Sequence, residues 1–124
     1  MHVSARAALG FGCYRLTTQS HCDALRQSLV SGLCRHIDTS PNYGDGASEL
    51  LVGKAVQGWL EAGGTRADLT ICTKVGVLQG LDLADAKHRE AIGRPWPGVV
   101  KVSSSAWHCI SAEYIAHCVQ RSAD

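Results

Sequence analysis

Three short apolar runs, each followed along the chain by a helical pattern, constrain the fold of this chain most strongly. The runs are AALGFGC (residues 7–13), CRHIDT (34–39) and DLTICTKV (68–75), and each is typical of a β-strand. Strands that alternate with helices along a chain form parallel pairs joined by right-handed crossovers. The sequence therefore predicts an α/β fold built on a parallel sheet.

Three helices are expected where apolar residues recur at helical spacing. The first should be capped by Ser20, which begins an S-x-x-D pattern with Asp23, and should end near Gly32. The second should begin near Ser48, and the third should be capped by Ser111. The expected apolar faces are Cys22, Leu25, Leu29 and Leu33; then Leu51, Val52, Ala55, Val56, Trp59 and Leu60; and finally Tyr114, Ile115, Cys118 and Val119.

The segment 76–110 has weak periodicity and contains the stretches RPWPG and SSS, so we expect a long loop there. The total length of 124 residues suits one domain spanning residues 1–124. Three strands cannot close a barrel, so an α/β barrel would be only partly represented.

The charge balance narrows the range of partners. Twelve basic and eleven acidic residues give a formal charge of +1, which supplies no basic surface for nucleic acid or for a membrane. No apolar run approaches the roughly 18 residues that a membrane span needs. Cys13, Cys34 and Cys72 lie in strand-like runs, where a free thiol packs as a small apolar group. We therefore expect a cytoplasmic protein with reduced thiols.

Common ligand-binding motifs are incomplete. GFGCYR begins like a dinucleotide fingerprint but has Arg15 where the third glycine belongs. GDGASELLVGK has Ser48 where a phosphate-binding loop needs its first glycine. No C-x-x-C or H-x-x-x-H spacing occurs, so we expect no metal.

Asp38, Tyr43 and Lys74 form a different kind of pattern. Asp38 and Lys74 lie at the C-terminal ends of successive predicted strands, and Tyr43 lies on the loop between them. In a parallel barrel, catalytic residues gather at those ends. A lysine beside a tyrosine lowers the pKa of the phenol from about 10, and a carboxylate keeps a desolvated lysine charged. The alternative is structural: Asp38 caps a turn, Tyr43 packs in its loop and Lys74 is solvated.

Three blocks resemble the N-terminal part of the aldo/keto reductases, a (β/α)8-barrel family that reduces carbonyls with NADPH or NADH. The blocks are GFGCYRL, RHIDTSPNYGDGASELLVGKAV and LTICTKVG, in the family's order. The resemblance implies an α/β fold comprising the first three β/α units of a partial TIM (β/α)8 barrel. WHCI (107–110) also resembles a stretch that ends a long insertion in one subgroup of the family.

The resemblance also implies roles for individual residues. Tyr43 would be the general acid, Lys74 would tune its pKa, and Asp38 would pair with Lys74. Gly12, Cys13 and Asp38 would line the nicotinamide and ribose end of the cofactor pocket. NADP(H) is expected ahead of NAD(H), and no metal is implied.

The implied reaction is reduction of a small aldehyde or ketone, or the reverse oxidation of a sugar-like alcohol. The family's catalytic histidine lies on the strand after the helix predicted at 111–123, beyond Asp124. We therefore expect the isolated chain to be inactive and its open strand edges to favour self-association. The alternative is a non-catalytic binding or regulatory derivative of the barrel.

Overall fold

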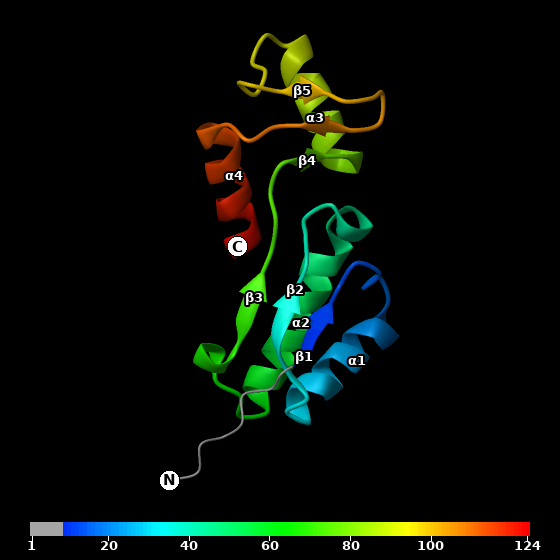
Figure 1. Cartoon of the computed structure of the whole chain (residues 1–124), viewed down its shortest axis with the longest axis vertical. Helices are drawn as coiled ribbons and strands as arrows, with labels where there is room; N and C mark the ends of the chain where they lie inside the picture. Colours follow the sequence, from blue (N-terminus) through cyan, green and yellow to red (C-terminus); the bar gives the residue numbers. More distant parts are fainter. Residues whose placement is uncertain (1–8) are drawn as a thin grey trace. The chain divides into compact units, whose positions relative to one another are not determined.

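The three predicted strands form one parallel sheet in the order β1-β2-β3 (Figure 1). The computed structural model describes residues 9–124, and residues 7–8 of the first predicted strand lie outside that range. The strands are β1 (Leu9–Gly12), β2 (Cys34–Asp38) and β3 (Thr70–Cys72). The third is shorter at both ends than the predicted run 68–75: a turn of 3-10 helix, η2 (Arg66–Asp68), precedes it, and it ends at Cys72, before Lys74.

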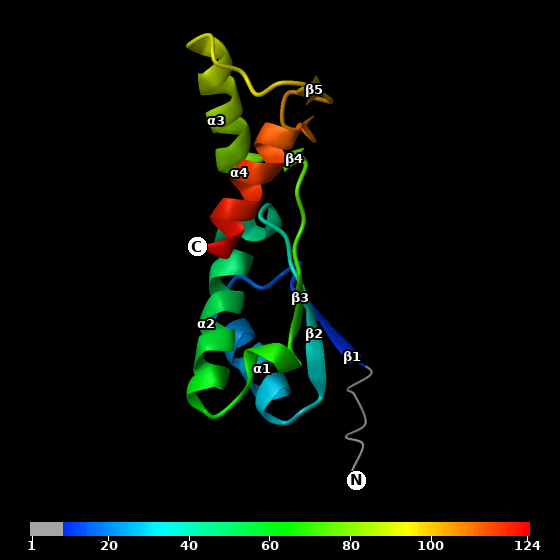
Figure 2. The ribbon, with the colours of Figure 1, turned by 90° about the vertical axis from the view of Figure 1, so that its left-hand side faces the viewer.

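The described chain divides into two compact units, with the boundary between Thr73 and Lys74. In the first unit, helices α1 (Gln19–Val30) and α2 (Ala47–Glu61) lie on the same side of the parallel sheet (Figure 2). These helices and the sheet enclose one core, made of Cys13, Leu16, Cys22, Leu25, Leu29, Cys34, Ile37, Val52, Ala55, Val56, Trp59 and Leu69.

The strand register gives the sheet two chemically different faces. Ile37 pairs with Ile71 and with Phe11, and Ile37 is buried against the helices. The next residue, Asp38, pairs with Gly12 and Cys72, and it is exposed. Side chains alternate between faces along a strand, so Asp38 and its cross-strand partners Gly12 and Cys72 lie on the face opposite the core.

Two details of α1 correct the sequence predictions. Thr18, not Ser20, caps the helix: its backbone is extended, and its hydroxyl accepts a hydrogen bond from the His21 amide at 3.3 Å. Ser20 lies inside the first turn. Leu33 does not extend the apolar face, because Gly32 ends the helix in a left-handed conformation (φ +76°) and Leu33 beyond it is exposed.

The second unit differs from the loop expected over 76–110. It contains β4 (Val77–Leu78), α3 (Gly80–Ala91), β5 (Val100–Lys101) and β6 (Trp107–His108), followed by α4 (Ala112–Ala123). The three strands pair antiparallel in the order β4-β6-β5. Only Leu83 and Ala86 of α3 are buried, which explains the weak helical periodicity of its sequence. The predicted Ser111 cap of α4 is confirmed.

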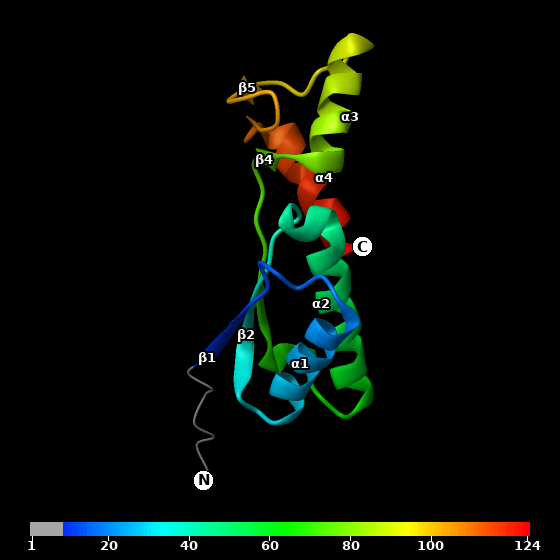
Figure 3. The same ribbon diagram turned by 90° about the vertical axis from the view of Figure 1, so that its right-hand side faces the viewer.

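Helices α3 and α4 lie on one side of the small sheet (Figure 3), and a second core forms there. The Trp96 ring packs against this core with the Arg89 guanidinium 3.8 Å from its centroid. Burial in the core raises the pKa of both Tyr114 and Cys118. The core residues are Leu78, Leu83, Ala86, Trp107, Cys109, Tyr114 and Cys118.

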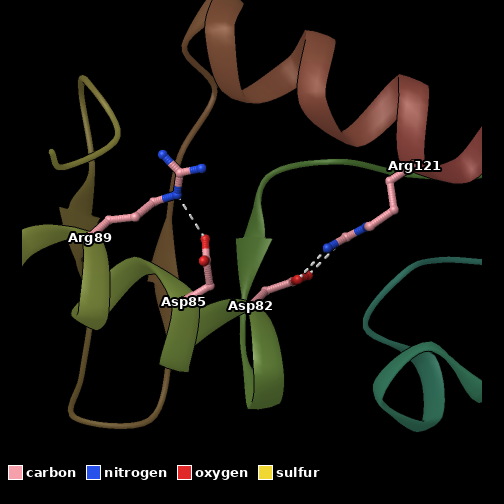
Figure 4. Close-up of polar contacts among 4 residues, drawn as sticks. All are labelled: Asp82, Asp85, Arg89 and Arg121. Atoms are coloured by element: carbon pink, nitrogen blue, oxygen red, sulfur yellow. Dashed lines mark hydrogen bonds and ion pairs between the residues drawn. The ribbon is translucent and has the colours of Figure 1, made fainter.

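Two ion pairs support α3 from its polar side (Figure 4). Arg121 of α4 contacts both carboxylate oxygens of Asp82, at 2.5 and 3.1 Å. Within α3, Arg89 pairs with Asp85 one turn earlier at 3.0 Å. The hydrogen bonds that Arg121 donates to Asp82 raise the pKa of the guanidinium. The Asp82–Arg121 pair therefore joins the two helices of this unit.

Cysteine burial follows the sequence expectation at Cys13 and Cys34, whereas Cys72 is exposed. No helix in the described part of the chain is both long and apolar enough to cross a membrane.

Candidate active site

Gly12, Cys13 and Asp38 are neighbours at the C-terminal ends of β1 and β2. Gly12 pairs with Asp38 in the strand register, and the Cys13 amide donates to the Asp38 carbonyl at 2.8 Å. A Cβ atom placed on Gly12 would meet nothing within 4 Å, so the main chain there is open to a ligand. Cys13 is only 1% exposed, and its side chain belongs to the core. Any cofactor contact from Cys13 therefore involves its main chain.

Tyr43 begins the turn that leads from β2 into α2, η1 (Tyr43–Gly46). Its amide donates to the Ser40 carbonyl at 3.1 Å, and the Ser40 hydroxyl bonds to the Asn42 side chain. The next three residues, 44–46, all have positive φ angles. Two of these three are glycines, which adopt that conformation at little cost. Tyr43 lies five positions after Asp38 in the sequence. The turn that it begins connects β2 to α2, which starts at Ala47.

Tyr14 is a neighbour of Tyr43 that the sequence prediction missed. The two rings meet edge to face, with centroids 5.2 Å apart and an interplanar angle of 89°. Aromatic pairs prefer this geometry, because the positive ring edge meets the negative ring face. The only sequence signal was its position, directly after Cys13 in the block GFGCYRL.

The first turn of α2 supplies two further polar residues that were not predicted. Ser48 is completely buried, and its hydroxyl donates to the Cys13 carbonyl at 2.9 Å. Glu49 accepts a hydrogen bond from the Thr73 hydroxyl at 2.5 Å. These contacts join α2 to the ends of β1 and β3.

Lys74 is the first residue of the second unit and is exposed. The relative positions of the two units are not determined, so its pairing with Asp38 and Tyr43 stays a prediction. Asp38 is exposed and Tyr43 is half-buried. The structure thus brings Gly12, Cys13 and Asp38 together and sets Tyr43 on the adjoining loop.

Residues 9–124, the described part, contain no group of three His, Cys, Asp or Glu residues that could hold a metal ion. Displaced pKa values often mark functional sites. Here Tyr114 and Cys118 have displaced pKa values chiefly because they are buried in the second core. These two shifts therefore reflect the packing of the second core and do not by themselves mark a site.

Comparisons with known proteins identify relatives of the chain by sequence and by fold. A sequence model of the aldo/keto reductase family matches residues 8–124. Among solved structures, the holo form of aldo-keto reductase AKR11C1 from Bacillus halodurans is similar, with a TM-score of 0.61 and 25% sequence identity. The match covers 92% of this chain and 30% of that chain. No curated protein matches the sequence.

The expected fold is confirmed: the parallel α/β arrangement corresponds to part of the reductase barrel, and the chain spans about a third of that protein's length. The family match extends over nearly the whole sequence and includes all three blocks in which the strand ends occur. The chain belongs to the aldo/keto reductase family.

Proposed function

We propose that these residues contribute to NAD(P)H-dependent reduction of a small aldehyde or ketone, or to the reverse oxidation of a sugar-like alcohol. The observation that carries the proposal is the pairing of Gly12 with Asp38 at the open strand ends, with Tyr43 on the adjoining turn. Family membership supports an oxidoreductase. The activity belongs to a barrel about three times as long as this chain.

In this proposal Tyr43 is the general acid, and its phenol donates a proton to the carbonyl oxygen of the substrate. Lys74, paired with Asp38, assists by favouring loss of that proton. The open main chain at Gly12, together with Cys13 and Asp38, holds the nicotinamide and ribose end of the cofactor. The bound cofactor, NADP(H) ahead of NAD(H), supplies the hydride.

A chimeric barrel tests the proposal directly. Residues 9–124 replace the matching third of the Bacillus halodurans reductase, and NADPH consumption is followed with a small aldehyde. We expect turnover, and we expect Tyr43→Phe to lower kcat by about 10²- to 10⁴-fold because the general acid is lost. Tyr114→Phe is the matched control, since it removes a phenol from the core of the second unit.

Equal activity in the Tyr43→Phe chimera and the parent chimera would refute the role of Tyr43. A chimera that binds NADPH but never turns over would favour a non-catalytic derivative of the fold. The isolated chain is assayed in parallel, and we propose that it is inactive by itself.

A further inference from the structure

We propose that the first turn of α2, Ser48-Glu49, is a positioning element that holds the three strand ends at which the candidate site is built. The importance of this element for catalysis rests on the proposed function. The hydrogen bonds that define it are independent of any activity. They lie within the first unit, from β1 to Thr73.

Ser48 anchors the ends of β1 and β2 through a directed pair of hydrogen bonds. Ser48 is 0% exposed, and Thr39 is 2% exposed. Ser48 donates to the Cys13 carbonyl at 2.9 Å, and the two hydroxyl oxygens lie 2.8 Å apart. A hydroxyl has a single proton to donate. Since Ser48 gives its proton to the carbonyl, Thr39 must donate to Ser48.

The main chain extends this link to β3. The Cys13 amide donates to the Asp38 carbonyl, and the Thr39 amide donates to the Cys72 carbonyl, both at 2.8 Å. Cys13 is therefore held at both of its polar main-chain groups, at the amide by β2 and at the carbonyl by Ser48. A buried polar group left without a partner is costly, so this arrangement resists small displacements.

Glu49 makes the corresponding contact beyond β3. Its carboxylate accepts a hydrogen bond from the Thr73 hydroxyl, with 2.5 Å between the two oxygens, and the two residues are 24 positions apart in the sequence. A hydrogen bond to an ionised carboxylate is stronger than one between neutral groups. A carboxylate in the first turn of a helix is also favoured by the helix dipole. This contact holds Thr73, the last residue of the first unit, which directly precedes Lys74 in the sequence.

Each anchored residue is a neighbour of a candidate site residue. Cys13 follows Gly12, Thr39 follows Asp38, and Thr73 precedes Lys74. Displacement of a reacting group by about 1 Å can lower a catalytic rate by about 10²-fold. Two adjacent side chains of one helical turn thus contact the chain at the end of all three strands.

The test compares Ser48→Ala with Ser48→Thr in the 124-residue chain, using amide hydrogen exchange measured by NMR. Ser48→Ala should speed exchange at the Cys13 and Thr39 amides by about tenfold beyond any global change, because buried partners lose their hydrogen bonds. Ser48→Thr keeps a hydroxyl and should restore much of the protection. Ser28→Ala is the control, since that hydroxyl donates to the Leu25 carbonyl within α1 at 2.8 Å.

The Glu49 contact is tested by Glu49→Ala against Glu49→Gln, which retains an acceptor oxygen. Shifts of the Thr73 and Lys74 amide resonances should be larger for the alanine variant. Equal exchange in the Ser48→Ala and Ser28→Ala variants, or equal shifts for both Glu49 variants, would overturn the proposal.

In the chimeric barrel, Ser48→Ala should lower kcat about tenfold or more with little change in KM, as expected when positioning is lost. An unchanged kcat would overturn the catalytic part of the inference. Insensitivity to Tyr43→Phe, combined with the expected exchange at Cys13 and Thr39, would refute the proposed function and leave the anchoring intact.

Discussion

Gly64 follows the end of α2 at a position with no room for a side chain. Its amide donates to the Trp59 carbonyl at 3.0 Å, and a Cβ atom added there would overlap the Trp59 indole ring. Trp59 is only 5% exposed, and the Arg35 guanidinium lies 5.2 Å from the ring centroid. Gly64→Ala must therefore displace either a core tryptophan or the end of its helix.

The expected loss of folding stability in Gly64→Ala follows from these contacts. Overpacking a well-filled core costs about 1 to 3 kcal/mol, and loss of the Arg35–Trp59 contact adds about 0.5 to 1 kcal/mol. Gly53→Ala is the matched control, because Gly53 is exposed in the middle of α2 with open space around it. Alanine there should stabilise the helix by about 1 kcal/mol. The two variants should thus differ by roughly 2.5 to 5 kcal/mol.

The free energy of unfolding is best measured by native-state hydrogen exchange at the buried Ile37 and Val56 amides, which report on the first unit alone. Gly63→Ala provides a second comparison, because Gly63 has open space but a left-handed backbone (φ +97°). It should cost about 1 to 2 kcal/mol from backbone strain alone. Equal stability of the Gly64→Ala and Gly53→Ala variants would refute the placement of Trp59 over Gly64.

Three further predictions concern other parts of the chain. Burial raises the pKa of Cys118 above its value in the unfolded chain, so the stability of the second unit should be full below about pH 8 and should fall as the pH rises. Urea unfolding at a series of pH values should show this fall, and the fall should be shallower in the Cys118→Ala variant. A double-mutant cycle on Asp82 and Arg121 should give a coupling of about 1 kcal/mol, because the pair is bidentate and only partly exposed. Thr18→Ala should destabilise α1 by about 1 kcal/mol whereas Ser20→Ala should be nearly neutral, and thermal unfolding followed by circular dichroism compares them.

Local signals in the sequence were sufficient for much of the fold. The strand and helix order of the first unit was predicted from apolar periodicity, and the Ser111 cap was read from one residue and its neighbours. The sequence could not predict whether Thr18 or Ser20 caps α1, because the cap depends on which of the two residues has an extended backbone. Helix α3 was not predicted because few of its residues are buried. The ion pair that Arg121 makes with Asp82 of this helix joins residues 39 positions apart, so it is not visible in the local sequence.

In the candidate site, too, local relations between residues were predictable from the sequence and long-range contacts were not. Asp38 and Tyr43 belong to one continuous block, so their relation was visible in the sequence. The bond from Ser48 to Cys13 spans 35 positions, and a buried serine looks like any other serine near a helix start. Such contacts become apparent only when the parallel register brings the strand ends together.

That register also explains why the position of Asp38 is secure although its side chain is exposed. Ile37 and Asp38 are consecutive, so the pleat that buries the isoleucine directs the aspartate to the opposite face. A slip by one residue would expose Ile37, at a loss of about 1.5 to 3 kcal/mol, and would bury an unpaired carboxylate at a larger cost. The sum approaches the whole stability of a small domain, roughly 5 to 15 kcal/mol. The hydrophobic core of the first unit therefore maintains the placement of Asp38 opposite Gly12, and the α2 turn has only to refine it.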